Sequence, residues 1–430
     1  MRRRIRPLIV IVSAAALAPA VIASSPAGAA YRMQRAAVCR GVRTERSTVD
    51  IASSLTGIAA TSTCNVWAVG NHSNKTLIEH WNGRQWRQVP SPSVRARGIF
   101  YNRLNGVATT SFGSAWAVGD IEDFSRTAVR FDHTLIEHWN GRRWTRVRSP
   151  DPGSGRNYNV LEAVAASSRR DAWAVGWFTS GRYGSEGTLM LHWDGQSWTH
   201  IASPTPTGGY NVRLTGVTAL SPTSAWAVGH YSLDDQANPY QVRTLIEHWD
   251  GQRWAIVPSP DPAGHALHHF SELNAVAGDT HRLWAVGTYS RPGTRPRTLI
   301  ETWNGAAWTK VPSPNPPGTY QAISLDGVAM ARGGAWAVGG YGADDPIDFS
   351  RPGHTLIEHW NGSQWLRVPS PSKPGSHSFS ALTAIAFLSP GKLMAAGDWI
   401  CRDAIVPIAE RLVHGSWRFV ATAGVSGSIC

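Results

Sequence analysis

A short pattern of hydrophobic and polar positions recurs along most of the chain. Each copy opens with an apolar stretch such as LTGIAA at residues 55–60, followed by WAVG at 67–70, TLIEHW at 76–81 and a tryptophan at 86. Short runs rich in β-branched and aromatic residues, bounded by turn residues, predict β-strands. Each copy is therefore expected to contain four short strands.

The copies recur at a nearly constant period. Their opening leucines are Leu55, Leu104, Leu161, Leu214, Leu273, Leu325 and Leu382. Consecutive leucines are 49, 57, 53, 59, 52 and 57 residues apart, and a period of this size indicates a solenoid or a propeller. Four-stranded units that pack face against face around a channel form a propeller. We therefore predict an all-β fold for residues 50–430: a seven-bladed β-propeller with four antiparallel strands per blade.

An Asn-Gly or Asp-Gly pair separates the third strand of each of the first six repeats from the fourth. These pairs begin at Asn82, Asn140, Asp194, Asp250, Asn304 and Asn361. Both residues tolerate positive φ, as a two-residue type I′ turn demands. The third and fourth strands are therefore predicted to form an antiparallel hairpin.

The order of hydrophobic strand, WAVG, strand, turn and tryptophan resembles kelch and galactose-oxidase-like propellers, and also tectonin-type lectin repeats, in a secreted repeat protein of the actinobacterial type. The resemblance covers roughly residues 50–420, and WAVG stands where kelch repeats usually have a double glycine. It implies a propeller with its site on the face that carries the variable loops.

Length variation is confined to one set of loops. In the first six repeats, the loops between the second and third strands contain 5, 14, 11, 14, 10 and 15 residues, whereas the last two tryptophans of each repeat are always five residues apart. In an up-and-down blade, the variable loops share a rim with the connections that lead into the next repeat. That rim is the expected binding face.

Aromatic residues precede the opening leucines on this rim. They are Phe100, Tyr101, Tyr158, Tyr210, Phe270, Tyr320 and Phe379. Around a channel mouth, such side chains can stack on sugar rings or other planar groups. The alternative is an apolar cap that packs the loops against the blades.

Two loops of the same rim carry acidic residues, which are Asp234, Asp235, Asp344, Asp345 and Asp348. Their oxygens suit calcium, but the loops lack the DxDxDG spacing. Solvated turns are the preferred interpretation, and we expect neither a metal nor a cofactor.

The repeated tryptophans and Glu-His pairs are expected to be structural. A large aromatic residue that recurs in every repeat suits packing between blades. Adjacent residues of a strand point to opposite faces, so Glu79-His80 is not a catalytic dyad. Thr302 replaces the histidine in the fifth repeat and Leu191 replaces the glutamate in the third, which a structural role tolerates.

Catalytic signatures are absent from the sequence. It contains no GxSxG, HExxH or Walker motif. The W-N-G-x-x-W turn lacks the Ser and Asp of a sialidase box. A galactose-oxidase-like copper site would need a Tyr-Cys crosslink, but the four cysteines lie only in the first and last parts of the chain and are better explained as disulfides. A non-enzymatic recognition module is therefore preferred. The alternative is a propeller lyase, hydrolase or oxidoreductase with its site at the channel mouth, using His265, His268 or His269.

The N-terminus has the pattern of a signal peptide. Residues 1–6 are basic, residues 8–23 are mostly apolar, and small residues follow at 27–29. An uncleaved anchor is the alternative, but the apolar run is shorter than the roughly 20 residues of a spanning helix and contains Pro19. We expect residues 1–30 to be removed, residues 31–49 to form an extension, and the secreted protein to have no transmembrane segment.

The formal charge falls from +12 to +8 once the four arginines of the signal peptide are removed. The basic residues are spread through every repeat, which indicates a solvated surface. Nucleic-acid binding would need a clustered basic stripe and is not expected. The expected partner is a glycan, a cell-wall polymer or an extracellular protein.

Secretion favours disulfides, and we predict the pairs Cys39–Cys64 and Cys401–Cys430. Cys64 and Cys401 are expected on opposite rims, whereas bridged Cα atoms lie within about 7 Å of each other. Mass spectrometry of the non-reduced protein should return these two bridges. A bridge between Cys39 and Cys430 is the alternative and would contradict the prediction.

Overall fold

The described part of the computed structural model contains strands and no helix. The chain divides into two units, Met1–Val38 and Cys39–Cys430. The first unit, with the expected signal peptide, lies outside the described residues. The described residues are 39, 41–44, 52–96, 98–124, 130–153, 157–179, 186–233, 241–264, 269–318, 320–331, 334–342, 353–372, 378–401 and 404–423.

Each repeat forms four strands, and the first two lie toward the channel. The first strands are β1 (Ser53–Ser62), β5 (Ile99–Ser111), β9 (Asn159–Ser168), β13 (Gly209–Ser221), β17 (Phe270–Gly278), β21 (Ala322–Ala331) and β25 (Ser378–Ser389). The second strands are β2 (Asn65–His72), β6 (Ser114–Asp123), β10 (Asp171–Thr179), β14 (Ser224–Leu233), β18 (Leu283–Ser290), β22 (Gly334–Gly342) and β26 (Lys392–Cys401).

The other two strands of each repeat lie toward the outside. The third strands are β3 (Lys75–Trp81), β7 (Phe131–Trp139), β11 (Glu186–Trp193), β15 (Gln241–Trp249), β19 (Arg297–Trp303), β23 (His354–Trp360) and β27 (Ala404–Val413). The fourth strands are β4 (Trp86–Gln88), β8 (Trp144–Val147), β12 (Trp198–His200), β16 (Trp254–Ile256), β20 (Trp308–Lys310), β24 (Trp365–Val368) and β28 (Ser416–Val420).

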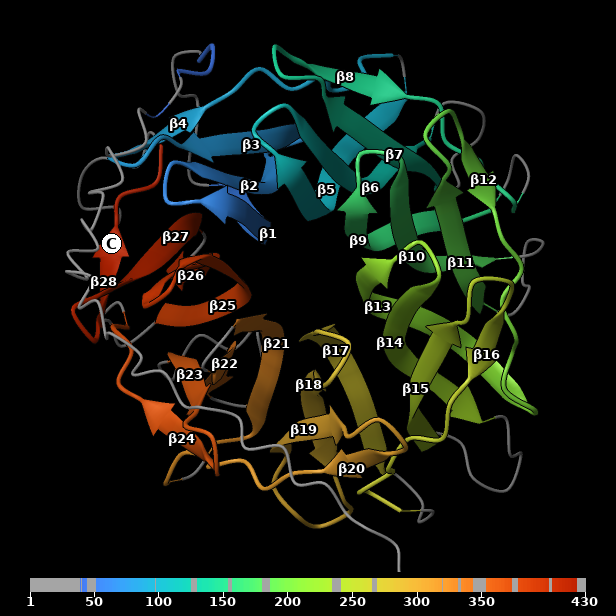
Figure 1. Cartoon of the computed structure of the whole chain (residues 1–430), viewed down its shortest axis with the longest axis vertical. Coiled ribbons are helices and arrows are strands. Elements are labelled where there is room, and N and C mark those ends of the chain that lie inside the picture. The colour runs from blue at the N-terminus through green and yellow to red at the C-terminus, as the bar shows by residue number, and fades with distance from the viewer. Residues whose placement is uncertain are drawn as a thin grey trace, which may run out of the picture. The chain divides into compact units, whose positions relative to one another are not determined.

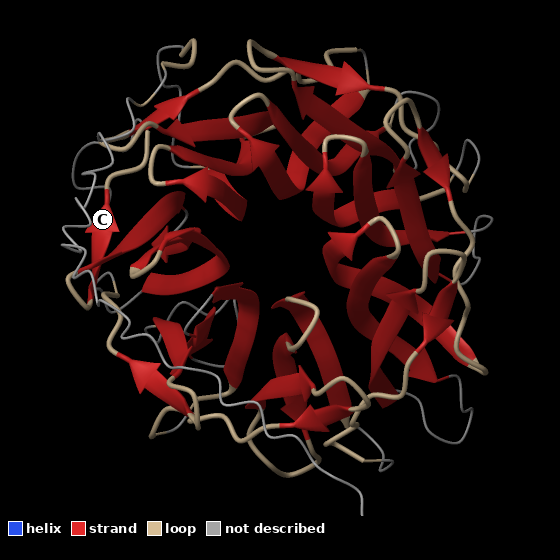
Figure 2. Ribbon diagram, in the orientation of Figure 1, coloured by secondary structure: helices blue, strands red, loops and turns tan. Residues whose placement is uncertain are grey.

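Pairing inside each blade is antiparallel and follows chain order, as in β1 with β2, β2 with β3 and β3 with β4. The blades, numbered 1 to 7 in chain order, follow one another around a ring, with the first strands innermost (Figure 1). Strands account for the regular structure throughout this ring (Figure 2). The predicted fold, an all-β propeller of seven four-stranded blades, is confirmed.

The hairpin between the third and fourth strands is also confirmed, but the expected turn type is wrong. In blade 1 the connection spans four residues, 82–85, and only Gly83 has a positive φ, of 94°. Asn82 Oδ1 instead accepts hydrogen bonds from the backbone N–H groups of Arg84 (3.0 Å) and Gln85 (3.1 Å). The side chain of the Asn or Asp thus stabilises an Asx turn rather than supplying positive φ.

The repeated tryptophans pack between neighbouring blades, as expected. Trp67 of blade 1 lies 4.9 Å from Trp139 and 5.1 Å from Trp144 of blade 2, measured between ring centroids. The tryptophan pairs equivalent to Trp67 and Trp139 have ring centroids 4.8 to 4.9 Å apart at five successive junctions between blades. These indoles therefore fill the space between sheets, where each buries an area of roughly 200 Å².

The histidine of TLIEHW lies on the tryptophan of its own blade. His80 packs on Trp67 at 4.4 Å between ring centroids, and its Nε2 is 3.0 Å from Asn65 Oδ1. Burial lowers the pKa of His80 to about 4, so its ring is neutral. The histidine thus has a packing role and does not meet the glutamate beside it.

That glutamate faces the blade before it. Six copies are fully buried, which are Glu79, Glu137, Glu247, Glu301, Glu358 and Glu410. The hydroxyl of Ser259 in blade 4 donates to Glu301 of blade 5 at 3.0 Å and also lies 2.9 Å from Thr244 Oγ1. Serines of the repeated Ser-Pro motif donate to Glu137, Glu247, Glu358 and Glu410 in the same way. The carboxyl is therefore a hydrogen-bonded link between blades.

Burial makes these links neutral. It raises the pKa of Glu301 to about 8, with similar values for Glu79, Glu137, Glu358 and Glu410, and it raises that of Glu247 to about 7. A buried carboxylate without a cation would be far costlier than a neutral carboxyl. In blade 3, Leu191 takes the place of the glutamate and is fully buried among apolar residues.

Contacts at equivalent positions close the ring between blade 7 and blade 1, with a backbone N–H in place of the serine hydroxyl and a methionine in place of the second-strand tryptophan. The backbone N–H of Ala423 donates to Glu79 Oε2 at 3.2 Å. Met394 packs in one cluster with Trp81 and Trp86. No strand is exchanged between the two ends of the described chain, so the ring is closed by side-chain contacts and by the isolated bridge from Ala52 to Ile405.

One predicted disulfide is observed directly. Cys39 is bonded to Cys64, with 5.3 Å between their Cα atoms, and this bond ties residue 39 to the β1–β2 turn. Cys401, at the end of β26, is also in a disulfide. Its expected partner, Cys430, lies outside the described residues.

We expect thermal stability to fall as pH rises from about 5 to about 8. Each buried glutamate has a folded-state pKa above its unfolded value of 4.5. The folded state therefore keeps protons that the unfolded state releases in this range, and its stability decreases. Glu301→Gln keeps the acceptor for Ser259 but cannot ionise. The difference in Tm between pH 5 and pH 8 should be smaller in this variant than in the parent protein, and smaller again when Glu358→Gln is added.

Ser259→Ala is the matched control. It removes the hydrogen-bond donor and leaves the carboxyl in place, so it should lower Tm by a few degrees at both pH values. A pH dependence that is the same in Glu301→Gln and the parent protein would show that Glu301 is already ionised in the fold.

Candidate functional site

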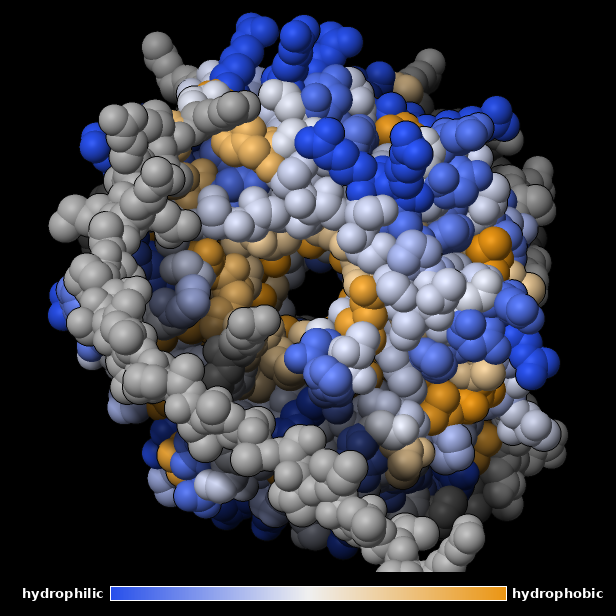
Figure 3. Space-filling model, viewed as in Figure 1, coloured by the Kyte–Doolittle hydropathy of each residue, from blue (hydrophilic) through white to orange (hydrophobic). Residues whose placement is uncertain are grey.

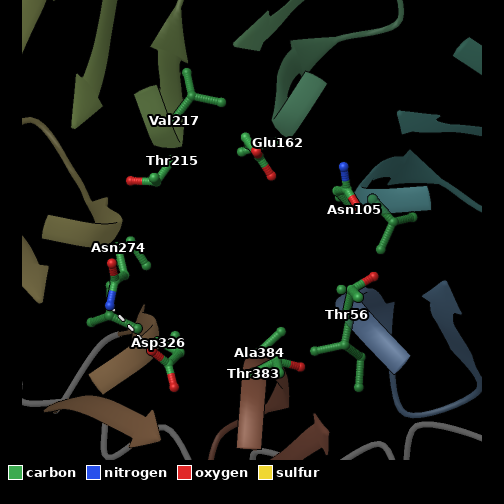
Figure 4. Close-up of a pocket in the computed structure, with 18 of the residues that line it drawn as sticks. Thr56, Asn105, Glu162, Thr215, Val217, Asn274, Asp326, Thr383 and Ala384 are labelled. Carbon is green, nitrogen blue, oxygen red and sulfur yellow. Dashed lines mark hydrogen bonds between the residues drawn. The ribbon is translucent and has the colours of Figure 1, made fainter. Parts of the chain in front are cut away.

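The channel is lined by three consecutive residues from each blade, directly after the opening leucine. In blade 1 these are Thr56, Gly57 and Ile58. The cavity they enclose has a volume of about 160 Å³. Hydrophobic residues surround the central opening in Figure 3, and the polar residues of the triplets lie around the cavity in Figure 4.

The first residue of each triplet is polar in all seven blades. These residues are Thr56, Asn105, Glu162, Thr215, Asn274, Asp326 and Thr383. Five of them donate a hydrogen bond to the carbonyl of the opening leucine in the next blade, at 2.6 to 3.1 Å. The bond from Thr383 to the Leu55 carbonyl closes this circle. We call the seven residues the channel ring.

Glu162 and Asp326 are the two carboxyls of the channel ring. Among the described residues, neither bonds to the leucine carbonyl of the next blade. Asp326 instead accepts from Ser324 (3.0 Å) and Asn274 (3.1 Å), the contact drawn in Figure 4. Glu162 accepts from the indole N–H of Trp177 at 3.1 Å. Burial raises the pKa of both groups, that of Asp326 to about 6.

Two aromatic side chains lie between two arginines on the variable-loop side of blades 2 to 4. The Arg213 guanidinium lies 4.2 Å from the Trp177 ring. Trp177 lies 6.1 Å from Tyr158, and the Arg130 guanidinium lies 5.8 Å from the Tyr158 ring. We call Arg130, Tyr158, Trp177 and Arg213 the mouth ladder. Both of its aromatic side chains are half-buried, so each ring is partly exposed to solvent.

Carboxylates hold the arginines of this region in place. Arg130 is bidentate with Asp132, through bonds of 2.9 and 2.8 Å, and Arg213 bonds both oxygens of Glu186. Charge-assisted bidentate pairs of this kind fix both position and orientation. Because each guanidinium has its own carboxylate, the positive net charge of the protein is not concentrated on the ladder.

The aromatic residues expected at the channel mouth differ in exposure. Phe100 is 57% exposed and contacts Tyr101, which is 36% exposed. Tyr158, Tyr210, Phe270 and Phe379 are half-buried. Tyr320 is buried, and its ring packs against Tyr341 in the core between blades 5 and 6. Of the seven, only Tyr158 joins the mouth ladder.

Other candidates from the sequence do not enter this site. His269 is fully buried, and His265 and His268 lie outside the described residues, as do Asp234, Asp235, Asp344, Asp345 and Asp348. Within the described part of the chain, no group of three or more His, Cys, Asp or Glu residues could hold a metal ion.

Sequence reasoning missed Trp177, Arg213 and Glu162. Trp177 carried a usable signal, because it and Trp399 are the two tryptophans that stand outside the three repeated positions. Both follow the glycine that ends the second-strand motif, at the rim of the variable loops. Arg213 and Glu162 flank the opening leucines of blades 4 and 3, but many arginines and glutamates occur elsewhere, so residue type alone did not distinguish them.

No protein-family model matches the chain, and no curated protein does. A solved structure of a mutant of Aleuria aurantia lectin, in complex with alpha-methyl-L-fucoside, aligns over 89% of this chain and 99% of its own, with 12% identity and a TM-score of 0.41.

Two further solved structures align over 86% of the chain. One is a protein of unknown function from Dyadobacter fermentans, covered over 98% of its length, with 10% identity and a TM-score of 0.45. The other is a xylan beta-1,4-xylosidase from Bacillus halodurans, covered over 90%, with 10% identity and a TM-score of 0.35. At this level of similarity, no ligand or reaction is transferred to this chain.

Proposed function

We propose that this protein is a secreted, non-enzymatic recognition module that binds a glycan on the variable-loop side of the propeller, over the mouth ladder. The observation that carries the proposal is the pair of partly exposed rings, Tyr158 and Trp177, between two arginines that carboxylates hold in place.

The chemistry of the ladder suits a sugar. Apolar faces of a pyranose ring stack on aromatic side chains, and the hydroxyl groups around its edge need fixed donors and acceptors. Here the donors are guanidinium N–H groups of Arg130 and Arg213, and the acceptor is the partly exposed Glu186 carboxylate, because the Asp132 carboxyl that pairs with Arg130 is fully buried. The resemblance of the repeats to tectonin-type lectin repeats supports the same ligand class. A cell-wall polymer would be a repeating form of this ligand.

The covalent structure supports an extracellular location. Disulfides persist in oxidising compartments, and the Cys39–Cys64 bond ties the N-terminal extension to blade 1. No helix in the described ranges has the length and apolar character to cross a bilayer. The expected signal peptide completes this part of the proposal.

The test starts with an array of neutral, amino and acidic oligosaccharides and with pull-down on insoluble peptidoglycan, chitin and xylan. Trp177→Ala and Tyr158→Ala should each weaken binding to the retained glycan roughly 2- to 10-fold, since an aromatic contact contributes about 0.5–1.5 kcal/mol. Both variants should keep a Tm close to that of the parent protein, because these rings are only half-buried.

Two substitutions serve as controls. Trp399→Ala removes the other tryptophan outside the repeat, on blade 7, and should leave binding unchanged. Tyr320→Ala removes a buried ring and should lower Tm rather than affinity. Unchanged affinity in folded Trp177→Ala would refute the proposed site. Release of soluble products from a retained polymer would favour the alternative, a propeller enzyme.

A further inference from the structure

Glu162 departs from the rule that five members of the channel ring follow. In blades 1, 2, 4, 5 and 7, the residue after the opening leucine donates sideways to the next blade, as Thr56 does to the Leu104 carbonyl (2.6 Å) and Thr215 to the Leu273 carbonyl (2.6 Å). At this position of blade 3, the carboxyl instead accepts the Trp177 indole N–H at 3.1 Å. The Glu162 side chain thus bonds to a residue of its own blade instead of bonding to the next blade.

Trp177 is held on its edge as well as its face. Glu162 holds the indole edge from the channel side, while Arg213 of blade 4 lies 4.2 Å from the ring. Arg213 is in turn bonded to both oxygens of Glu186 on β11. Glu162 therefore fixes the partly exposed Trp177 by a direct hydrogen bond, and Glu186 fixes it indirectly by holding Arg213 against the ring.

This arrangement removes an interblade bond. Within the described residues, the junction from blade 3 to blade 4 keeps the bond from Ser203 to the buried Glu247, but it has no channel-ring bond from Glu162 to the carbonyl of Leu214. A threonine at position 162, as at the equivalent position of blades 1, 4 and 7, would supply that bond. The glutamate therefore gives up a contact that would stabilise the ring.

We propose that Glu162 is a positioning residue for ligand recognition, which orients the indole of Trp177 at the channel mouth instead of linking blade 3 to blade 4. This inference rests on the proposed function, because the oriented indole is the stacking platform for the glycan. The Glu162 carboxyl affects ligand binding only by orienting Trp177 and does not contact the ligand.

A readout without ligand tests the geometry. In protein labelled with ¹⁵N-tryptophan, the indole N–H signal that disappears in Trp177→Phe belongs to Trp177. Its exchange with solvent should be slow in the parent protein and in Glu162→Gln, whose amide oxygen keeps the acceptor. In Glu162→Thr it should become faster, by up to about tenfold, because the hydrogen bond is lost.

Stability and binding separate this role from a structural one. Glu162→Thr should have an unchanged or higher Tm, because the threonine can donate to the next blade, and yet weaker binding on the oligosaccharide array. Glu162→Gln should restore binding. Asp326→Thr is the matched control: it makes the same change on the far side of the channel ring and should leave both the Trp177 signal and binding unchanged.

Three results would overturn the inference. The first is unchanged Trp177 exchange in Glu162→Thr, and the second is an equal loss of binding in Asp326→Thr. The third is a loss of binding in Glu162→Gln despite a protected indole. If Glu162→Thr does not fold, Glu162→Asn reproduces the residue of blades 2 and 5 and carries the same expectation. If the array shows no binding, the proposed function fails, while the exchange experiment still decides what Glu162 does to Trp177.

Discussion

The propeller depends on contacts between blades that no backbone ladder supplies. Each blade pairs its own four strands, so the described residues of neighbouring blades are joined mainly by side chains, with isolated backbone contacts such as Val242 to Phe270 and Asn102 to Asn74. Tryptophans of neighbouring blades pack on each other at five successive junctions, and a buried glutamate accepts a hydrogen bond at most of the junctions. Because burial keeps that carboxyl protonated, the link carries no buried charge. The ring can close without exchanging a strand because the junction of blades 7 and 1 has equivalent contacts, in which Met394 packs with Trp81 and Trp86 and the buried Glu79 accepts from the Ala423 backbone.

Periodicity was sufficient to predict the architecture. The spacing of leucines and tryptophans determines the blade number, the strand order and the rim on which each connection lies, because all of these follow from repetition. The hairpin position was also predictable, but the turn type was not. An Asn-Gly pair is compatible with several turns, and the choice here follows from the four-residue connection, in which Asn82 Oδ1 reaches two backbone amides.

The site was less predictable, because it depends on residues that break the repeat. Sequence position predicted the same binding role for Tyr158 and Tyr320. In the structure, Tyr158 lies beside Trp177, whereas Tyr320 is buried against Tyr341. Local loop packing decides between these outcomes, and sequence spacing does not record it. Trp177 could have been found by listing the tryptophans outside the repeat. Glu162 could not, since its role depends on a contact with the residue fifteen positions later, on the neighbouring strand.

Blade 3 carries three departures from the repeat. It has Leu191 in place of the linking glutamate, Glu162 in place of a channel-ring donor, and Trp177 where other blades have smaller or non-aromatic residues. Leu191 removes a hydrogen bond to blade 2, and Glu162 removes one to blade 4. Trp177 places an apolar ring at a solvent-exposed rim. None of them is explained by the stability of the ring. Repetition provides an internal reference for this judgement. Asp326 of blade 6 also gives up its bond to the next blade, but it accepts from Asn274 of the channel ring and from Ser324 of its own strand. Glu162 instead accepts from a partly exposed tryptophan. This difference is why the proposed site is placed at blade 3.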